Sequence, residues 1–87
     1  MAFVVRIDRE EEKPDYKVFR ARADAERRFW LAAGASSERD FSGVALYQTV
    51  ADDVRQAVDA VKSGDKAGAT LLEIHPYPVV DLESLGL

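Results

Sequence analysis

Apolar residues recur at a helical spacing over residues 49–64. They stand at intervals of four, three, one and three residues, which places them on one stripe of an α-helix. This stripe consists of Val50, Val54, Ala57, Val58 and Val61. The pattern predicts a helix over about 49–63, capped by Thr49 and ended at Gly64. Val54 would lie in the core, so Val54→Asp is expected to abolish cooperative unfolding.

Alternation of apolar and polar residues predicts strands over 3–8, 42–49 and 69–75. The last of these places Leu71, Glu73 and His75 on one side of the chain. Strand, helix and strand over 42–75 are typical of a βαβ unit with a right-handed crossover.

Residues 15–34 permit two interpretations, because Ala, Arg and Glu favour a helix there while Tyr, Val, Phe and Trp favour a strand. In the first, a helix over 15–26 precedes a strand over 27–33. In the second, a strand over 16–22 forms a hairpin with 3–8, and a helix over 23–34 follows, with Ala25, Phe29, Ala32 and Ala33 facing inward.

Both interpretations give a single α+β domain over residues 1–87. We expect a two-layer sandwich, in which a mostly antiparallel sheet of four strands carries two helices on one face. The first interpretation gives the ferredoxin-like order β-α-β-β-α-β, which is slightly preferred over β-β-α-β-α-β because it is the commoner solution at this size.

Composition restricts the function. The chain has 87 residues and no cysteine, so neither disulfides nor thiolate chemistry is available. Its formal charge of −4 comes from residues 41–87, which disfavours nucleic-acid binding. No apolar run is long enough to span a bilayer, and the first residues do not resemble a signal peptide, so a cytoplasmic protein is expected.

His75 is the only histidine and stands at the end of a predicted strand, before Pro76. Together with Glu73 and with Tyr47 from a neighbouring strand, it could form a general acid–base site on one sheet face. The alternative is a polar residue at a strand end. We favour the alternative, because no other feature of the chain asks for catalysis.

Metal and cofactor sites lack their usual patterns. One histidine and no cysteine leave only carboxylates as ligands, and Asp52 and Asp53 are better explained as acids at a helix start. The five glycines stand singly, so no phosphate-binding loop is present. The sequence RRFW at 27–30 mixes cations with aromatics, which can bind nucleic acid. We interpret its aromatic side chains as core residues and its arginines as a solvated face. No cofactor or metal is expected.

A sheet face free of helices would carry apolar, aromatic and charged groups, which is typical of an interface. The candidate ligand or interface residues are Arg6, Tyr47, Leu71, Glu73, His75 and Tyr77. The tail also contains apolar residues that must pack against some surface, namely Val79, Val80, Leu82 and Leu85. We expect a non-catalytic interaction or regulatory module that acts through protein contacts as a homodimer. The same interpretation also allows an unidentified protein partner. The alternative function is a small ligand-binding domain or an enzyme that uses this sheet face with His75, Tyr47 and Glu73.

Overall fold

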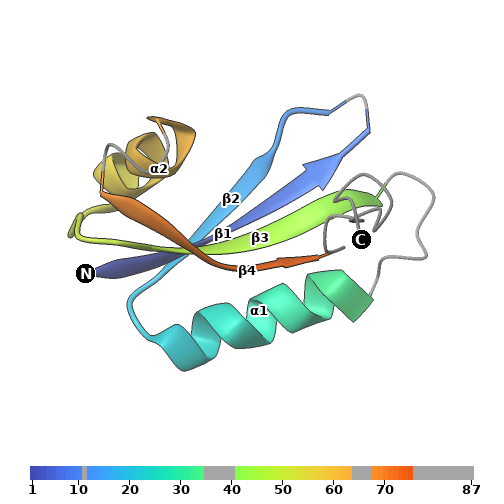
Figure 1. Cartoon of the computed structure of the whole chain (residues 1–87), viewed down its shortest axis with the longest axis horizontal. Helices are drawn as coiled ribbons and strands as arrows, with labels where there is room; N and C mark the ends of the chain where they lie inside the picture. The colour runs from blue at the N-terminus through green and yellow to red at the C-terminus, as the bar shows by residue number, and fades with distance from the viewer. Residues whose placement is uncertain (11, 35–40, 64–67, 76–87) are drawn as a thin grey trace, which may run out of the picture.

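The computed structural model describes residues 1–10, 12–34, 41–63 and 68–75 (Figure 1). The elements follow the order β-β-α-β-α-β, so the preference for the ferredoxin-like order was wrong and the second interpretation is confirmed. Their bounds are β1 Ala2–Arg9, β2 Asp15–Phe19, α1 Arg22–Gly34, β3 Phe41–Thr49, α2 Val54–Ser63 and β4 Ala69–His75.

The four strands form one antiparallel sheet in the order β2-β1-β3-β4, which confirms the predicted α+β class. The predicted parallel βαβ unit is wrong, because β3 and β4 are antiparallel neighbours in which Thr49 pairs with Ala69. A crossover helix that runs back along the strands would return the chain to the far end of the sheet. Here α2 lies across one end, and β4 starts where β3 ends (Figure 1).

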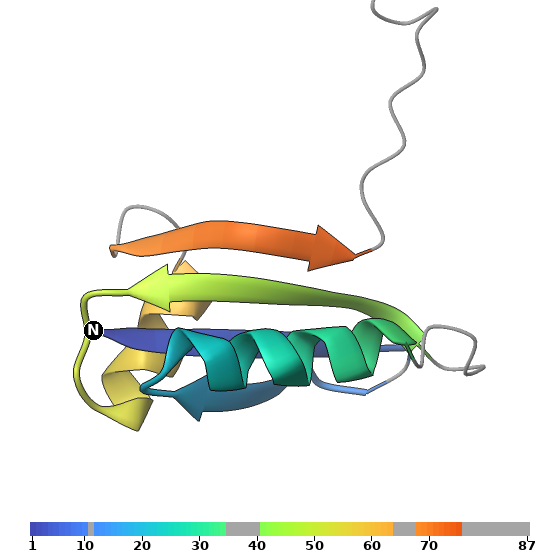
Figure 2. The same ribbon diagram turned by 90° about the horizontal axis from the view of Figure 1, so that it is seen from below.

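The two helices cover opposite faces of the sheet, not one face as predicted (Figure 1). Helix α1 packs on β1, β2 and β3 and runs along them, and β4 lies to one side of it (Figure 2). Helix α2 contacts all four strands. The sheet is therefore the middle of three layers.

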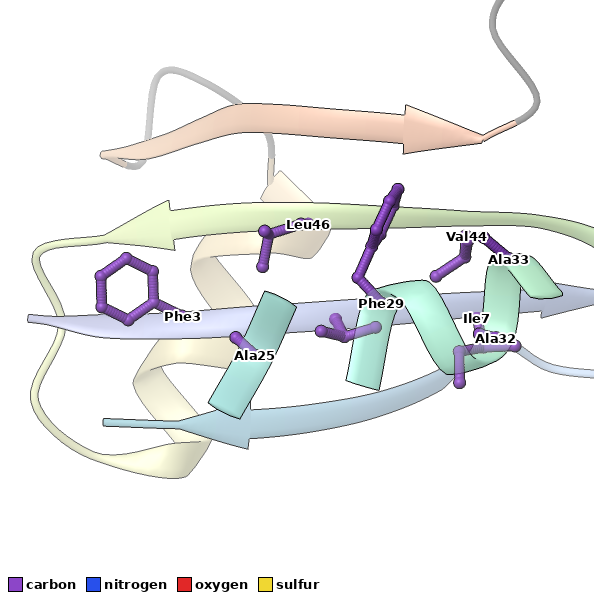
Figure 3. Packing of buried hydrophobic residues seen from close by; sticks show 9 residues of the cluster. Phe3, Ile7, Ala25, Phe29, Ala32, Ala33, Val44 and Leu46 are labelled. Carbon is purple, nitrogen blue, oxygen red and sulfur yellow. The ribbon is translucent and has the colours of Figure 1, made fainter. Parts of the chain in front are cut away.

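The larger core lies under α1 (Figure 3). Phe29 projects from the helix among the odd-numbered residues of β1 and the even-numbered residues of β3, and its side chain is fully buried. The cluster consists of Phe3, Val5, Ile7, Ala25, Phe29, Ala32, Ala33, Val44 and Leu46. Three of its four helical members are alanines, whose small side chains let the helix backbone approach the sheet closely.

This packing explains why residues 22–34 are helical. As a helix they bring four apolar residues to one side, with Trp30 and Leu31 left exposed. As a strand, the same residues would place Phe29 and Leu31 on one face and Trp30 on the other. Residues 15–19 alternate in exposure and pair with β1, so they form the second strand of a hairpin.

The second core lies under α2 and contains smaller residues, with Ala57, Ala60 and Val61 as the buried helical members. The helix starts at Val54, later than predicted. Asp53 caps it, because its Oδ1 accepts a 2.9 Å hydrogen bond from the Gln56 amide. Thr49 instead accepts a 3.2 Å bond from the Ala51 amide in the preceding turn.

The later start changes which residues are buried. Val50 and Val54 are 72% and 64% exposed, so the predicted stripe was wrong at its first two positions. The premise of the prediction that Val54→Asp abolishes cooperative unfolding is therefore wrong, because a charge at this exposed position stays in water.

We therefore expect the larger core and the start of α2 to respond differently to substitution. Phe29→Ala should lower the free energy of unfolding by about 3–5 kcal/mol, because it empties the centre of the larger core. Val54→Asp should change it by less than about 0.5 kcal/mol, since the position is exposed and the helix start favours an acid. Urea denaturation followed by circular dichroism measures both. Loss of cooperative unfolding in Val54→Asp would contradict the observed packing of α2.

Candidate functional site

A β-bulge divides the predicted acid–base residues between the two faces of the sheet. Tyr47 pairs with Leu71, whereas the preceding residue of β3, Leu46, pairs with Glu73. Leu72 is the extra residue, and it packs against the α1 core. The bulge shifts the alternation of β4. Leu71 therefore faces the α2 side with Tyr47, whereas Glu73 pairs with Leu46 of the α1 core and faces the α1 side.

His75 lies on the α1 side at the end of β4. It pairs with Val44 of the α1 core, and its ring centroid lies 6.4 Å from that of Phe41, which packs against the same core. Tyr47 packs against the α2 core on the other side. Tyr47, Glu73 and His75 therefore do not converge on one face. The strand-end position predicted for His75 agrees with its place at the last residue of β4.

A polar group on the α2 side surrounds Arg6 of the central strand β1. The guanidinium carbon lies 5.6 Å from the centroid of the Tyr47 ring, within the range of a cation–π contact. Its Nε lies 3.3 Å from Asp8 Oδ2. The Nε atom is shielded from solvent and makes no well-directed hydrogen bond with the residues described, so Asp8 balances its charge without satisfying the donor fully.

Beside Arg6, the end of the sheet that α2 leaves uncovered forms a hollow of about 160 Å³. Its lining residues are Arg6, Asp8, Ser42, Gly43, Val44, Ala45, Ile74 and His75. The volume is below the roughly 300–1,000 Å³ of ligand pockets. The hollow has room for a small polar group, and its main cation already has a carboxylate partner.

A larger groove of about 300 Å³ lies on the α1 side, between that helix and the edge strand β2. It is lined by Phe19, Asp24, Arg27, Arg28 and Leu31. Leu31 is 64% exposed, so the groove combines apolar surface with cations. Arg27 Nη1 lies 4.0 Å from Asp24 Oδ1, a contact between exposed groups that contributes little to stability. We call these five residues the α1–β2 groove.

A third hollow, of about 270 Å³, is lined by Met1, Arg20 and Asp52. The Met1 ammonium donates a 2.8 Å hydrogen bond to Asp52 Oδ1, and this bond and the ammonium charge hold the pKa of Asp52 below its ordinary value. A lowered pKa stabilises the fold above the unfolded pKa, and the contribution disappears as the pH falls through the folded value. Both groups are exposed, so the effect is small.

Leu71 and Tyr77 are the two predicted interface residues outside the groups described above. Leu71 is 44% exposed on β4. Tyr77 lies outside the residues described. Sequence reasoning missed Asp8, although its position two residues after Arg6 on a predicted strand indicated a shared face. It also missed the α1–β2 groove, because nothing in the sequence indicated that Phe19 and Leu31 would flank one surface.

Comparisons with protein-family models, with curated proteins and with solved structures find no match to this chain. Within the described parts of the chain, no three His, Asp or Glu side chains gather as metal ligands would. Neither α1 nor α2 is long and apolar enough to cross a membrane.

The position of His75 gives a direct test. We expect His75→Ala to change the free energy of unfolding by less than about 1 kcal/mol, because a half-buried strand-end ring loses mainly its contact with Phe41. Thermal denaturation measures the change, and NMR shift changes should centre on Phe41. Shift changes that extend to the Tyr47 ring would contradict the separation by the bulge.

Proposed function

We propose that the chain is a non-catalytic interaction module that pairs with a second copy of itself through the outer edge of β4. The observation that carries this proposal is the position of β4. It is the last strand of the sheet, and on the side away from β3 no described residue pairs with it. Its outward N–H and C=O groups can therefore extend a sheet into another chain.

The sequence of β4 lacks most devices that protect an edge. ATLLEIH contains no lysine, arginine or proline, and its one charged side chain is Glu73. Edge strand β2 is shorter, with five residues against seven, and carries Lys17 and Asp15. In proteins that stay monomeric, edge strands are usually short, carry charged side chains or are interrupted by a bulge or proline. The bulge at Leu72 interrupts β4, but the strand continues on both sides of it.

The side chains of β4 also fit an interface. Leu71 is an exposed apolar residue, and the adjacent strand residues Leu72 and Ile74 are half-buried. Antiparallel pairing of two β4 strands about a two-fold axis would bring both copies of Leu71 to one interface. Such pairing would also bury apolar surface in addition to that of the core. This addition matters because a chain of this size buries only a modest fraction of its surface by itself.

A small-ligand or catalytic function receives less support. The hollow beside His75 is smaller than typical ligand pockets. The three side chains considered for acid–base chemistry lie on two sides of the sheet. Protein contact through β4 requires neither a pocket nor convergent catalytic groups.

Sedimentation of the full chain tests the proposal. Leu71→Lys should raise the dissociation constant of the dimer at least about tenfold, equivalent to about 1.4 kcal/mol, because a charge on the edge opposes strand pairing. Val54→Lys is the matched control, since Val54 is also an exposed apolar residue but lies on α2. It should leave the dissociation constant unchanged.

Hydrogen exchange supplies the structural readout. Outward amides of β4 should become protected as the concentration rises and the dimer forms, while those of β2 should not change. A wild-type chain that stays monomeric at high micromolar concentration, or equal weakening by both lysine substitutions, would overturn the proposal.

A further inference from the structure

The α1–β2 groove runs beside the second edge of the sheet. Strand β2 is the first strand of the sheet order, and within the described residues only β1 pairs with it. Helix α1 begins at Arg22, shortly after β2 ends at Phe19, and runs back alongside the strand (Figure 2). One wall of the groove is therefore a helix, and the other ends in backbone N–H and C=O groups that can accept a further strand.

The side chains of the groove combine apolar surface with a cation. Its helical members, Asp24, Arg27, Arg28 and Leu31, recur at the spacing of one helix face. Leu31 is 64% exposed, and Phe19 of β2 is half-buried. The acid Asp24 lies 4.0 Å from Arg27, whereas the half-buried Arg28 forms no ion pair with any described residue. The groove therefore favours an occupant that brings both apolar side chains and a carboxylate.

The order of these groups along the groove fits an extended peptide. Phe19 lies at the end where α1 begins, Leu31 lies two turns into the helix, and Arg28 stands one turn before Leu31. The helix rises by roughly 10 Å from Asp24 to Leu31. In an extended peptide, three alternate side chains on one side span roughly 13 Å. An apolar, an acidic and an apolar side chain at alternate positions would therefore meet Phe19, Arg28 and Leu31 in turn.

The charges of β2 make a second copy of β4 a poor occupant. Asp15 and Lys17 pair with Ile7 and Val5 of β1, so they share the α1 side with the groove, and Lys17 Nζ lies 3.6 Å from Asp15 Oδ2. Charged side chains on an edge oppose pairing with an apolar strand. Strand β4 has only one charged residue, Glu73. A strand added to β2 therefore needs polar side chains of its own as well as the contacts of the groove.

We propose that the α1–β2 groove binds an extended acidic segment of another protein, which adds a strand to the outer edge of β2. The backbone of β2 supplies affinity, and Phe19, Arg28 and Leu31 select apolar, acidic and apolar side chains at alternate positions. The proposal goes beyond the pairing of β4 and is independent of it, because β2 and β4 are opposite edges of the sheet. Both edges can be occupied at the same time.

A titration of the isotope-labelled full chain with a synthetic peptide tests the proposal. The probe is the capped heptapeptide Thr-Leu-Thr-Glu-Thr-Leu-Thr, and NMR follows its binding. Shift changes should centre on β2, the Phe19 ring and the Leu31 methyl groups, and the outward amides of β2 should become protected from hydrogen exchange. The capped peptide Thr-Thr-Leu-Leu-Glu-Thr-Thr has the same composition without the alternation. Its dissociation constant should be at least about tenfold higher.

A charge exchange isolates the role of Arg28. Arg28→Glu should raise the dissociation constant of the glutamate peptide at least about tenfold, because it places like charges together. The same variant should bind the analogue with lysine in place of glutamate more tightly than the wild type does, which also shows that the variant is folded. Arg55→Glu, at an exposed position of α2, is the matched control and should leave both dissociation constants unchanged.

Four results would overturn the proposal. The first is the absence of shift changes at millimolar peptide, and the second is an equal affinity of the wild type and Arg28→Glu for the glutamate peptide. The third is binding that shifts β4 in place of β2 or leaves the β2 amides unprotected. The fourth is a change in the self-association of the chain in Arg28→Glu, measured by sedimentation without peptide, since the occupant would then be a second copy.

Discussion

Strand β1 buries both of its faces, and the rest of the structure is arranged around this constraint. Val4 and Val5 point to opposite sides of the sheet, and each has no exposed surface. A half-covered sheet would leave one of them in water at a cost of about 1.5–3 kcal/mol. Burial of both requires a helix on each side and a strand at each edge of β1, which α1, α2, β2 and β3 supply.

The two covers differ, and the difference determines where polar groups gather. Helix α1 runs along the strands and brings Phe29 and three alanines to them. Helix α2 has ten residues and lies across one end of the sheet. Its cover stops before Arg6, so the guanidinium of a central strand meets Asp8 and Tyr47 at the margin of the α2 core. The hollow beside Arg6 is a consequence of the short second helix.

In the described part of the chain, each sheet face carries a helix, so the exposed surfaces lie mainly at the sheet edges and along the helix flanks. The bulge at Leu72 turns Leu71 to one side and Glu73 to the other, which separates the groups that chemistry would need together. The outer edge of β4 and the α1–β2 groove are exposed surfaces that this separation does not affect. Both combine apolar side chains with groups that can pair, backbone amides at the edge and arginines in the groove.

The sequence by itself determined the local elements whose residues alternate or repeat clearly. The strands at 3–8, 42–49 and 69–75 and the existence of a helix before Ser63 follow from periodicity, which reflects local geometry alone. The α+β class follows from their mixture. For residues 22–34 the local preferences conflict, and the fit of Phe29 and its alanines to the sheet decided for a helix.

Only the tertiary structure decided the element order, the use of both faces and the failure of the candidate site. The residues before a helix can be helical or extended without changing the spacing of the apolar positions, so the periodicity placed Val54 in the core, whereas the structure starts the helix at Val54 with Asp53 as its cap. A single extra residue in β4 reverses which side chains share a face. Whether a bulge forms there depends on the packing of Leu72 against the α1 core, which is a contact between distant residues that no local pattern records.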